Sequence, residues 1–299
     1  MAEQIPLSAE ASALDPELDA ARNDHTHQIA EDLAYRRLGI VNVVFFGLPG
    51  AADRQWVLID AGLPGTKAMI QSAAAERFGE RSRPAAIIMT HGHFDHVGTL
   101  TDLADEWDVP VYAHPRELPY LNGSASYPPG DPSVGGGVMA ALARFYPRGP
   151  VDVRRHLHAL PEAGMVPGMT GWHWLHTPGH SVGHVSLWRE ADRTMIVGDA
   201  FVTTKQESIY AVATQTAEMH GPPMYYTTEW DKAAASVQLL ASLEPNLVVT
   251  GHGEPMQGLE MRTALHRLAE QFEQVAVPDK GRYLQEPARA EDRTAYKAP

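Results

Sequence analysis

The chain has 299 residues, of which 44% are hydrophobic and 20% charged, the balance of an ordinary globular protein rather than of a disordered or fibrous one. The formal net charge of −13 argues against a nucleic-acid backbone as the main partner, because binding phosphates requires a surface rich in lysine and arginine. The sequence contains no cysteine, which excludes disulfides, zinc–thiolate sites and a cysteine nucleophile.

The start of the chain lacks the basic residues and the apolar run of a secretory signal. No apolar stretch approaches the roughly 20 residues that are needed to span a bilayer. We therefore expect a cytoplasmic protein with no membrane partner, and a homodimer is the expectation from base rates alone.

Residues 1–35 are rich in alanine and acidic residues, and we expect an extended N-terminal arm with at most one short helix. Two runs of β-branched and aromatic residues follow, at 40–46 and 56–60. The turn-like segment between them predicts a β-hairpin.

Strands and helices then alternate along the chain. Residues 66–78 predict a helix with Thr66 as its N-cap. Residues 86–90 are a short apolar run, typical of a strand covered on both faces, and they lead directly into a histidine-rich loop. Residues 98–107 predict a helix and 109–113 a further strand. This alternation indicates an α/β sandwich.

Two long irregular segments interrupt this alternation. Residues 116–150 and 201–228 are rich in proline, glycine and aromatic residues, and loops of such length in a compact domain are commonly lids or binding segments. The remaining predicted elements are strands at 173–177, 185–188, 194–197 and 247–250, and helices at 231–243 and 258–275. We expect one domain over residues 36–280 with a four-layer αββα arrangement, followed by a charged surface tail at 281–299.

The histidine-rich loop places three imidazoles and a carboxylate within six positions: His91, His93, Asp95 and His96. Imidazole suits zinc, iron, nickel and copper, whereas a carboxylate favours harder ions and can bridge two of them. A catalytic zinc usually takes about three ligands from the protein. The larger number here is typical of two ions about 3.5–4 Å apart that share one site.

Three more candidate ligands stand at predicted strand ends. His180, Asp199 and His252 each follow an apolar run and a glycine. A tight turn at the end of a strand exposes a polar group at the edge of the sheet, so these side chains are candidates to complete the site.

At this point the sequence resembles the metallo-β-lactamase superfamily. The resemblance covers most of residues 38–260, and its motifs stand in matching order: D-A-G at Asp60, H-x-H-x-D-H from His91 to His96, T-P-G-H-S at His180, G-D at Asp199 and G-H-G at His252. It implies the αββα sandwich of that family and two divalent metal ions, with zinc first and iron or manganese as alternatives.

The resemblance also implies a division of roles among the candidate residues. One ion would be held by His91, His93 and His180, and the other by Asp95, His96 and His252. Asp199 would bridge the two ions, and Asp60 would orient the histidine-rich loop without binding metal.

The chemistry that follows is hydrolysis. Two cations lower the pKa of a shared water toward neutrality, and the hydroxide attacks a carbonyl centre. An ester or a lactone is the first choice of substrate, ahead of a thioester, a β-lactam or a phosphoester. An iron oxidoreductase on the same fold is the alternative from another class.

A competing motif is the G-x-S-x-G sequence around Ser181, which resembles the nucleophile elbow of serine hydrolases. That elbow requires a helix directly after the serine, whereas residues 184–188 predict a strand. A serine hydrolase would also leave the loop from His91 to His96 unexplained, so it is the weaker hypothesis.

Some residues have only weak support as site residues. His184 and His220 are candidates for contacts behind the metal or with substrate. Aromatic residues of the irregular segments, such as Tyr210, are candidates to line an apolar pocket. Tyr225 or Tyr226 would then bind a carbonyl oxygen, and the partner would be a small molecule with an apolar part.

Overall fold

The computed structural model describes residues 5–14, 25–135, 141–204 and 217–299. The first sheet has the order β2-β3-β4-β5-β6-β7-β8. It is antiparallel from β2 to β5 and parallel from β5 to β8. Its strands are β2 (His27–Ala30), β3 (Leu33–Leu38), β4 (Val41–Phe46), β5 (Val57–Ile59), β6 (Ala86–Ile88), β7 (Val111–Ala113) and β8 (Leu157–Ala159).

The second sheet has the order β14-β13-β11-β10-β9. Only the β11–β13 pair within it is parallel. Its strands are β9 (Trp172–His176), β10 (Val185–Arg189), β11 (Thr194–Gly198), β13 (Leu247–Thr250) and β14 (Met256–Gln257). A short separate pairing joins β1 (Ile5–Pro6) to β12 (Glu218–Met219).

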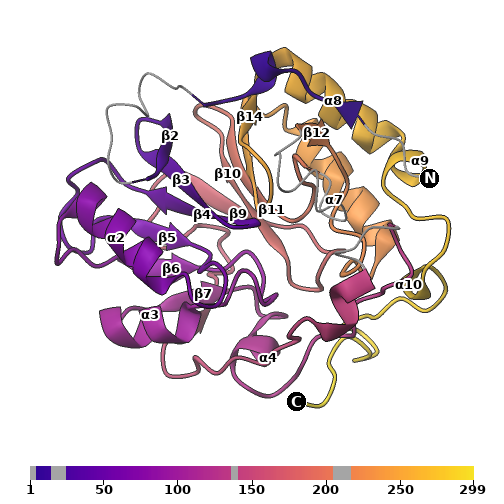
Figure 1. Cartoon of the computed structure of the whole chain (residues 1–299), viewed down its shortest axis with the longest axis horizontal. Helices are drawn as coiled ribbons and strands as arrows, with labels where there is room; N and C mark the ends of the chain where they lie inside the picture. The colour runs from indigo at the N-terminus through magenta and orange to yellow at the C-terminus, as the bar shows by residue number, and fades with distance from the viewer. Residues whose placement is uncertain (1–4, 15–24, 136–140, 205–216) are drawn as a thin grey trace.

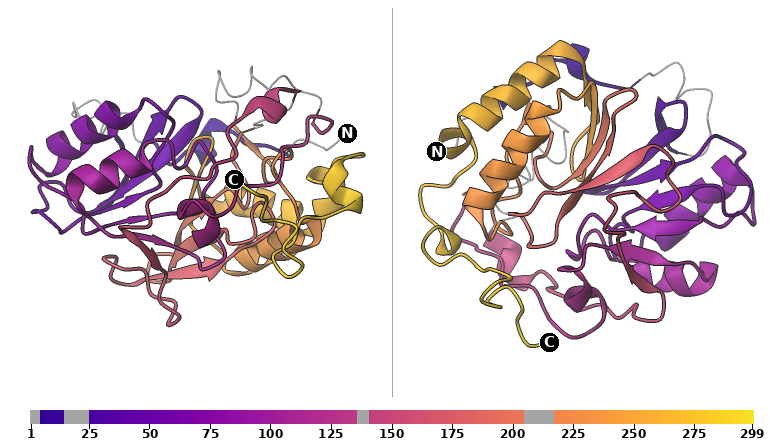
Figure 2. Two further views of the ribbon diagram at one scale, coloured as in Figure 1. Left: turned by 90° about the horizontal axis from the view of Figure 1, so that it is seen from below. Right: turned by 180° about the vertical axis from the view of Figure 1, so that it is seen from behind.

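Helices cover the outer face of each sheet (Figures 1 and 2). One outer layer consists of α2 (Lys67–Phe78) and α3 (Leu100–Trp107), and the other of α7 (Trp230–Ser242) and α8 (Gly258–Glu270), which α9 (Phe272–Val275) follows. The resulting order of layers is αββα. The shorter helical segments are η1 (Ala9–Ala11), α4 (Leu118–Leu121), η2 (Ala143–Phe145) and α10 (Arg282–Gln285).

Both faces of the central strands β5, β6, β11 and β13 are buried, which explains their apolar sequences. In β11, Met195 and Val197 pack in the cluster with α7 and α8, whereas Ile196 packs between the two sheets. Successive side chains of a strand point to opposite faces. A strand between two apolar layers therefore needs hydrophobic residues at consecutive positions.

The predicted hairpin is confirmed, because β4 and β5 pair antiparallel. The predicted helix over 66–78 is also confirmed, with Thr66 at the N-cap position, although its side chain does not cap the helix. The Thr66 hydroxyl donates to the Leu63 carbonyl at 2.7 Å and makes no capping bond. The hydroxyl therefore bonds within the preceding turn and not with the first turn of the helix.

The N-terminal arm is not uniformly extended. β3 begins at Leu33 and pairs along its length with β4, so the expected boundary after residue 35 falls inside a strand. Arg36 and Arg37 interrupt the apolar pattern there. The Arg36 guanidinium donates to the Met69 carbonyl at 2.8 Å, and this bond accommodates the charged side chain within the strand. Hydropathy alone does not predict a strand at such a position.

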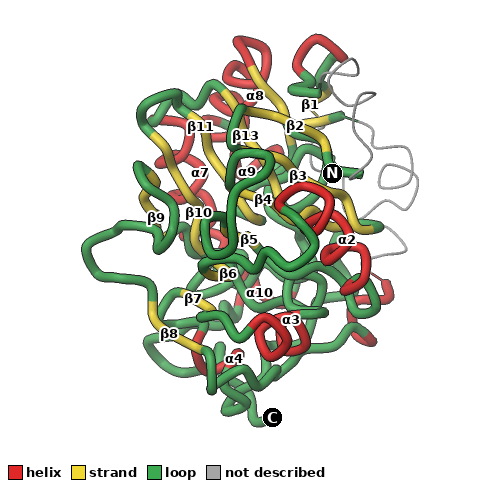
Figure 3. Tube along the Cα trace, turned by 90° about the vertical axis from the view of Figure 1, so that its left-hand side faces the viewer, coloured by secondary structure: helices red, strands yellow, loops and turns green. Residues whose placement is uncertain are grey.

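Residues 281–299 pack against the domain instead of forming a surface tail. Tyr283, Ala288 and Ala295 are buried in one cluster with Tyr120 and Tyr127. A bridge between residues 126 and 297 fixes the end of the segment. Figure 3 shows green loops around the C-terminus and beside α4, with β8 next to that helix.

Among the described residues, no helix has both the length and the apolar character to cross a membrane.

Candidate metal centre

The centre lies where the carboxyl ends of parallel strands meet. In the first sheet, Asp60 follows β5 and the loop from His91 to His96 follows β6, the neighbouring strand. In the second sheet, Asp199 follows β11 and His252 follows its parallel partner β13. Parallel neighbours end at the same edge, so residues far apart in the sequence arrive at one place.

The predicted ligands come together in three overlapping groups. In each group, one ligand atom per residue lies within 4.8 Å of the others. The groups are His91, His93 and His180; His91, His96 and Asp199; and Asp95, His96 and His252. All seven residues are buried. The middle group connects the outer two, which is the arrangement expected of a site shared by two ions.

Asp199 occupies the centre of this cluster. Its Oδ2 lies 3.1 Å from His252 Nε2 and 3.4 Å from His180 Nε2. Its Oδ1 lies 3.6 Å from His96 Nε2. The carboxylate therefore faces imidazoles of both outer groups, as a bridging ligand must.

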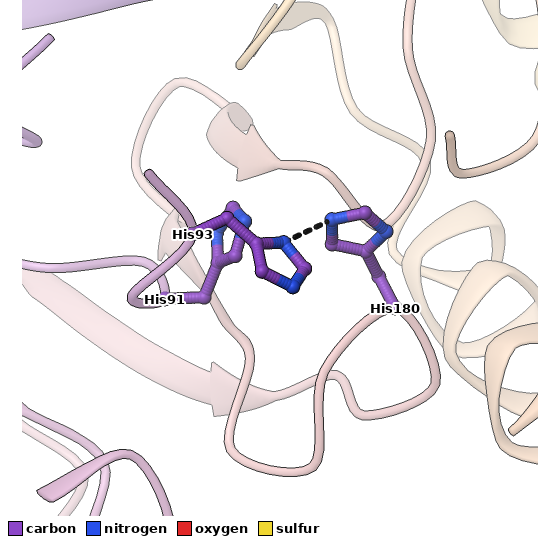
Figure 4. Close-up of side chains that lie close together, drawn as sticks. All are labelled: His91, His93 and His180. Carbon is purple, nitrogen blue, oxygen red and sulfur yellow. Dashed lines mark hydrogen bonds between the residues drawn. The ribbon is translucent and has the colours of Figure 1, made fainter. Parts of the chain in front are cut away.

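His91 and His93 come from the loop after β6, and His180 comes from the loop between β9 and β10 (Figure 4). His93 Nδ1 and His180 Nε2 approach to 2.9 Å. Loops from both sheets thus supply the three imidazoles of this ligand group. The distance between the two loops determines how the three rings lie relative to one another.

Hydrogen bonds orient the imidazole rings toward the centre. Asp60 Oδ2 accepts from His96 Nδ1 at 2.8 Å and from the Thr90 hydroxyl at 2.8 Å. Thr90 Oγ1 lies 3.1 Å from His91 Nδ1. Because the hydroxyl proton points to Asp60, Thr90 accepts from His91. In their neutral form both rings therefore carry the proton on Nδ1 and present a lone pair on Nε2.

His252 is oriented in the same way by the backbone. Its Nδ1 donates to the Ile40 carbonyl at 2.6 Å. Asn42 Nδ2 donates to the carbonyls of Thr250 and Gly253 at 2.9 and 2.7 Å. β4 thereby fixes the loop after β13, and His252 Nε2 faces the cluster.

Three atoms at the centre fit a metal ion. Among the described residues, His91 Nε2, His96 Nε2 and Asp199 Oδ1 are buried and have no hydrogen-bond partner. An unsatisfied buried polar atom costs about 1–3 kcal/mol. Imidazole nitrogen with carboxylate oxygen is a donor set for zinc-like divalent ions, so these atoms are suited to bind such ions.

The imidazoles divide into two classes by charge. Burial, with the neighbouring histidines, holds the pKa of His91 and of His93 well below the ordinary value, and burial lowers the pKa of His180 to about 4. Burial alone would also lower the pKa of His96, but Asp199 and Asp60 hold it well above the usual range. The pKa of His252 is raised, because Asp199 outweighs the effect of burial.

The Asp199 carboxylate is fixed by a close approach of the backbone. A Cβ atom at Gly251 would lie 2.0 Å from Asp199 Oδ1 and 2.9 Å from the His96 ring. Only glycine leaves room for both side chains at this position. The G-H-G motif therefore serves the neighbouring ligands as well as His252.

His184 lies behind the centre. Its Nε2 accepts from the Asp199 backbone N–H at 2.8 Å, and its Nδ1 lies 2.9 Å from Thr177 Oγ1. Burial lowers its pKa to about 3, so the ring is neutral. Because both ring nitrogens are occupied, His184 positions Asp199.

Sequence reasoning missed Glu117, a fully buried carboxylate. It accepts from the Gly92 N–H at 3.0 Å, and from the Ser181 hydroxyl and the Gly183 N–H at 2.9 Å each. A signal was present in the sequence, because Glu117 follows β7 as Asp60 follows β5. The residue stands in the irregular segment 116–150, where this position is not apparent without the sheet.

Ser181 is a poor nucleophile in this arrangement. Its hydroxyl donates to Glu117, and β10 rather than a helix follows the motif. The geometry of a nucleophile elbow is therefore missing here.

The aromatic candidates differ in their positions. The Tyr226 ring stacks on His93, with centroids 4.4 Å apart, and its buried hydroxyl has no partner among the described residues. Tyr225 packs beside Tyr226, and its carbonyl accepts from the Asp131 N–H. Tyr210 lies outside the described residues. The structure therefore places Tyr226 against His93, a candidate metal ligand.

His220 is buried but belongs to none of the three ligand groups found in the described part of the chain. Its backbone pairs with that of Val202, and its Nδ1 lies 3.1 Å from the Gly221 carbonyl. These contacts secure the segment that follows Asp199.

Comparison with known proteins agrees with this geometry. Residues 36–252 match the metallo-beta-lactamase superfamily. The "probable metallo-hydrolase YflN" of Bacillus subtilis (strain 168) is 42% identical over 258 residues, which cover 86% of this chain and 97% of that protein.

Solved structures share the fold. A B3 metallo-beta-lactamase with an active-site glutamic acid has a TM-score of 0.57 at 18% identity, covering 90% of this chain and 96% of its own. A beta-lactamase domain protein from Burkholderia ambifaria has a TM-score of 0.57 at 19% identity, covering 87% and 80%. The αββα fold predicted from the sequence is confirmed, and the chain belongs to the metallo-β-lactamase superfamily.

Proposed function

We propose that the protein is a two-metal hydrolase that cleaves a carboxylic ester or a lactone with an apolar part. The observation that carries the proposal is the middle ligand group of His91, His96 and Asp199, which shares His91 with one outer group and His96 with the other and has an unpaired ligand atom on each of its three residues. The relative from Bacillus subtilis, which aligns with this chain over 97% of its own length, is named a probable metallo-hydrolase. This name supports hydrolysis as the reaction class.

His91, His93 and His180 would hold one ion, and Asp95, His96 and His252 the other, with Asp199 between them. Zinc is our first choice, with iron or manganese as alternatives. Bound divalent ions lower the pKa of water and polarise an oxygen under attack.

The protein's own groups prepare the site for that chemistry. Burial alone would raise the pKa of Asp199, but His252 and His96 hold it well below its usual range, so this carboxylate stays ionised. Burial raises the pKa of Asp95, which favours a proton on that carboxyl in the absence of a cation. The two carboxylates thus differ in their readiness to accept a proton.

An aromatic wall beside the ligands supports a substrate with an apolar part. Tyr146 lies against both Phe94 and Tyr226, with ring centroids 5.1 and 6.3 Å apart. Burial, followed by the charge of Asp95, raises the pKa of Tyr226, so its hydroxyl keeps its proton at neutral pH. A protonated, unpartnered hydroxyl is suited to donate to a carbonyl oxygen.

The other partners follow from the same proposal. The substrate would be a small molecule, with neither a nucleic acid nor a membrane as partner, and the protein would act in the cytoplasm as a homodimer. Light scattering on the purified protein measures the last point directly.

A panel of lactones, simple esters, thioesters, β-lactams and phosphodiesters, assayed together with metal analysis, tests the function. We expect the highest kcat/KM for an ester or lactone with an apolar group, and loss of turnover on chelation. Preference for another class of substrate would overturn the choice of substrate, and full activity of a metal-free preparation would overturn the metal-dependent reaction.

A further inference from the structure

Glu117 binds both loops that supply the imidazoles of one ligand group. Its Oε2 accepts from the backbone of Gly92, between His91 and His93. Its Oε1 accepts from the backbone of Gly183, three residues after His180. One rigid carboxylate therefore spans the space between a loop of the first sheet and a loop of the second.

The two loops are shaped to let this carboxylate approach. A Cβ atom at Gly183 would lie 2.8 Å from Glu117 Cγ, and a Cβ atom at Gly92 would lie 2.9 Å from the Tyr127 hydroxyl. Neither position has room for a larger residue. The glycines of H-G-H and S-V-G-H thus stand where Glu117 and Tyr127 contact the loops.

The four bonded partners of Glu117 are all neutral. Besides the two backbone groups, the Ser181 hydroxyl and the Tyr127 hydroxyl donate to it. Burial raises the pKa of Glu117, and these hydrogen bonds oppose the effect. Because burying a carboxylate among neutral groups is costly, its presence indicates a role that apolar packing would not fill.

The C-terminal residues brace this contact from behind. Tyr120 stacks on Tyr127 with ring centroids 3.7 Å apart, and its hydroxyl donates to the Ala295 carbonyl at 3.0 Å. The backbones of Ser126 and Lys297 exchange hydrogen bonds of 2.8 and 2.9 Å. The position of the Tyr127 hydroxyl is therefore fixed by contacts on both sides.

We propose that Glu117 is a positioning residue that fixes the separation between the loop of His91 and His93 and the loop of His180. It thereby determines the affinity for the ion which these three imidazoles would hold. This inference rests on the two-ion site proposed above. The group of Asp95, His96 and His252 is anchored by other residues, so its ion should depend little on Glu117.

The variant Glu117→Gln tests this with almost no change in size. Each carboxylate oxygen accepts one backbone N–H, and a backbone N–H cannot reverse its direction. The glutamine amide offers one oxygen and one NH2 group, so one loop must face a donor and move away.

Asp131→Asn is a matched control. Its two oxygens also accept backbone N–H groups, from Ser133 and from Arg282, and it is buried. It belongs to none of the ligand groups found among the described residues. The same chemical change is therefore made away from the ligand loops.

The measurements are zinc stoichiometry and affinity by competition with a chromophoric chelator, and 15N spectra of the histidine side chains. We expect Glu117→Gln to unfold cooperatively and to bind one ion as the wild type does, while the other is weakened about 10- to 100-fold. The imidazole signals that change should be those of His91, His93 and His180. Asp131→Asn should bind both ions with wild-type affinity.

Wild-type affinity for both ions in Glu117→Gln, or an equal loss for both, would overturn the inference. A wild-type protein that binds one ion would instead refute the two-ion function, and the change in that ion's affinity in Glu117→Gln would still decide the role of Glu117. If Glu117→Gln does not fold, Tyr127→Phe removes one donor to Glu117 and one acceptor for Gly92, and a smaller loss at the same ion is expected.

Discussion

Two buried carboxylates flank the histidine-rich loop, one on each side of β6, and they act on it differently. Asp60, after β5, is connected to candidate ligand rings: it accepts from His96 directly and reaches His91 through Thr90, from whose backbone N–H it also accepts. Glu117, after β7, bonds to no ligand ring: it accepts from two backbone N–H groups of the ligand loops and from the hydroxyls of Ser181 and Tyr127. Asp60 therefore fixes which ring nitrogens carry protons, whereas Glu117 fixes where the rings stand.

This difference shows that a metal centre needs two kinds of support. A ligand must present a lone pair, and it must present it at the right place. In this protein the two requirements fall on residues after β5 and β7, the two parallel neighbours of β6, so each can be disturbed without the other.

The largest loss of metal affinity is expected from a change at Asp199, which lies between the two outer ligand groups. Asp199→Asn removes the charge that faces His252, His180 and His96, so we expect affinity for both ions to fall about 100-fold or more. Atomic absorption after dialysis measures the loss. The matched control is Asp192→Asn, a half-exposed partner of Arg189, which should keep both ions. Retention of two tightly bound ions by Asp199→Asn would contradict its bridging position.

Asp60→Asn tests the lone-pair requirement. Asp60 has a φ of 61°, a conformation that asparagine also tolerates, so the turn should survive. The amide cannot accept from every donor that the carboxylate serves, and His96 is free to place its proton on Nε2. We expect about a 10- to 100-fold loss of metal affinity, which chelator competition measures. Unlike Glu117→Gln, this variant should affect both ions, and an effect confined to one ion would remove the distinction drawn above.

Tyr226→Phe tests whether substrate approaches over His93, on the side of the centre that Glu117 supports. If the hydroxyl donates to the substrate carbonyl, its removal should lower kcat/KM about 10-fold, the cost of a hydrogen bond of roughly 1.5 kcal/mol. Metal affinity should not change. Tyr225→Phe, an adjacent residue, is the control, and equal losses in both variants would refute the assignment.

The smallest expected effect is the release of protons when a metal ion binds. In the metal-free protein the raised pKa of His96 and of His252 favours the protonated form of these rings, whereas the lowered pKa of His91, His93 and His180 leaves those rings neutral. A cation must displace the protons, so its affinity falls as the pH falls toward the raised pKa values.

Titration calorimetry in buffers of different ionisation enthalpy measures this release. The ion bound by Asp95, His96 and His252 should release more protons than the other. Equal release for the two ions would show that the two imidazole groups do not differ in charge.

The sequence by itself determined the candidate ligands, their order and the sandwich fold. Each ligand follows a local pattern of an apolar strand and a tight turn, as at His91, Asp199 and His252, and strands buried on both faces are hydrophobic at every position. These features need only neighbouring residues to be recognised. The family resemblance rests on the same local motifs.

Apart from Asp60 and His184, the residues that hold the candidate ligands in place were decided by the tertiary structure alone. Glu117 meets Ser181 and Gly183 across 64 and 66 positions of the chain, and residues 281–299 pack on Tyr120 and Tyr127. Such contacts depend on which strand ends meet at an edge and which loops cross it. A local sequence pattern does not indicate which strand ends meet or which loops cross. The contacts of Glu117 and of residues 281–299 with the candidate metal centre and its surroundings could therefore be recognised only in the folded chain.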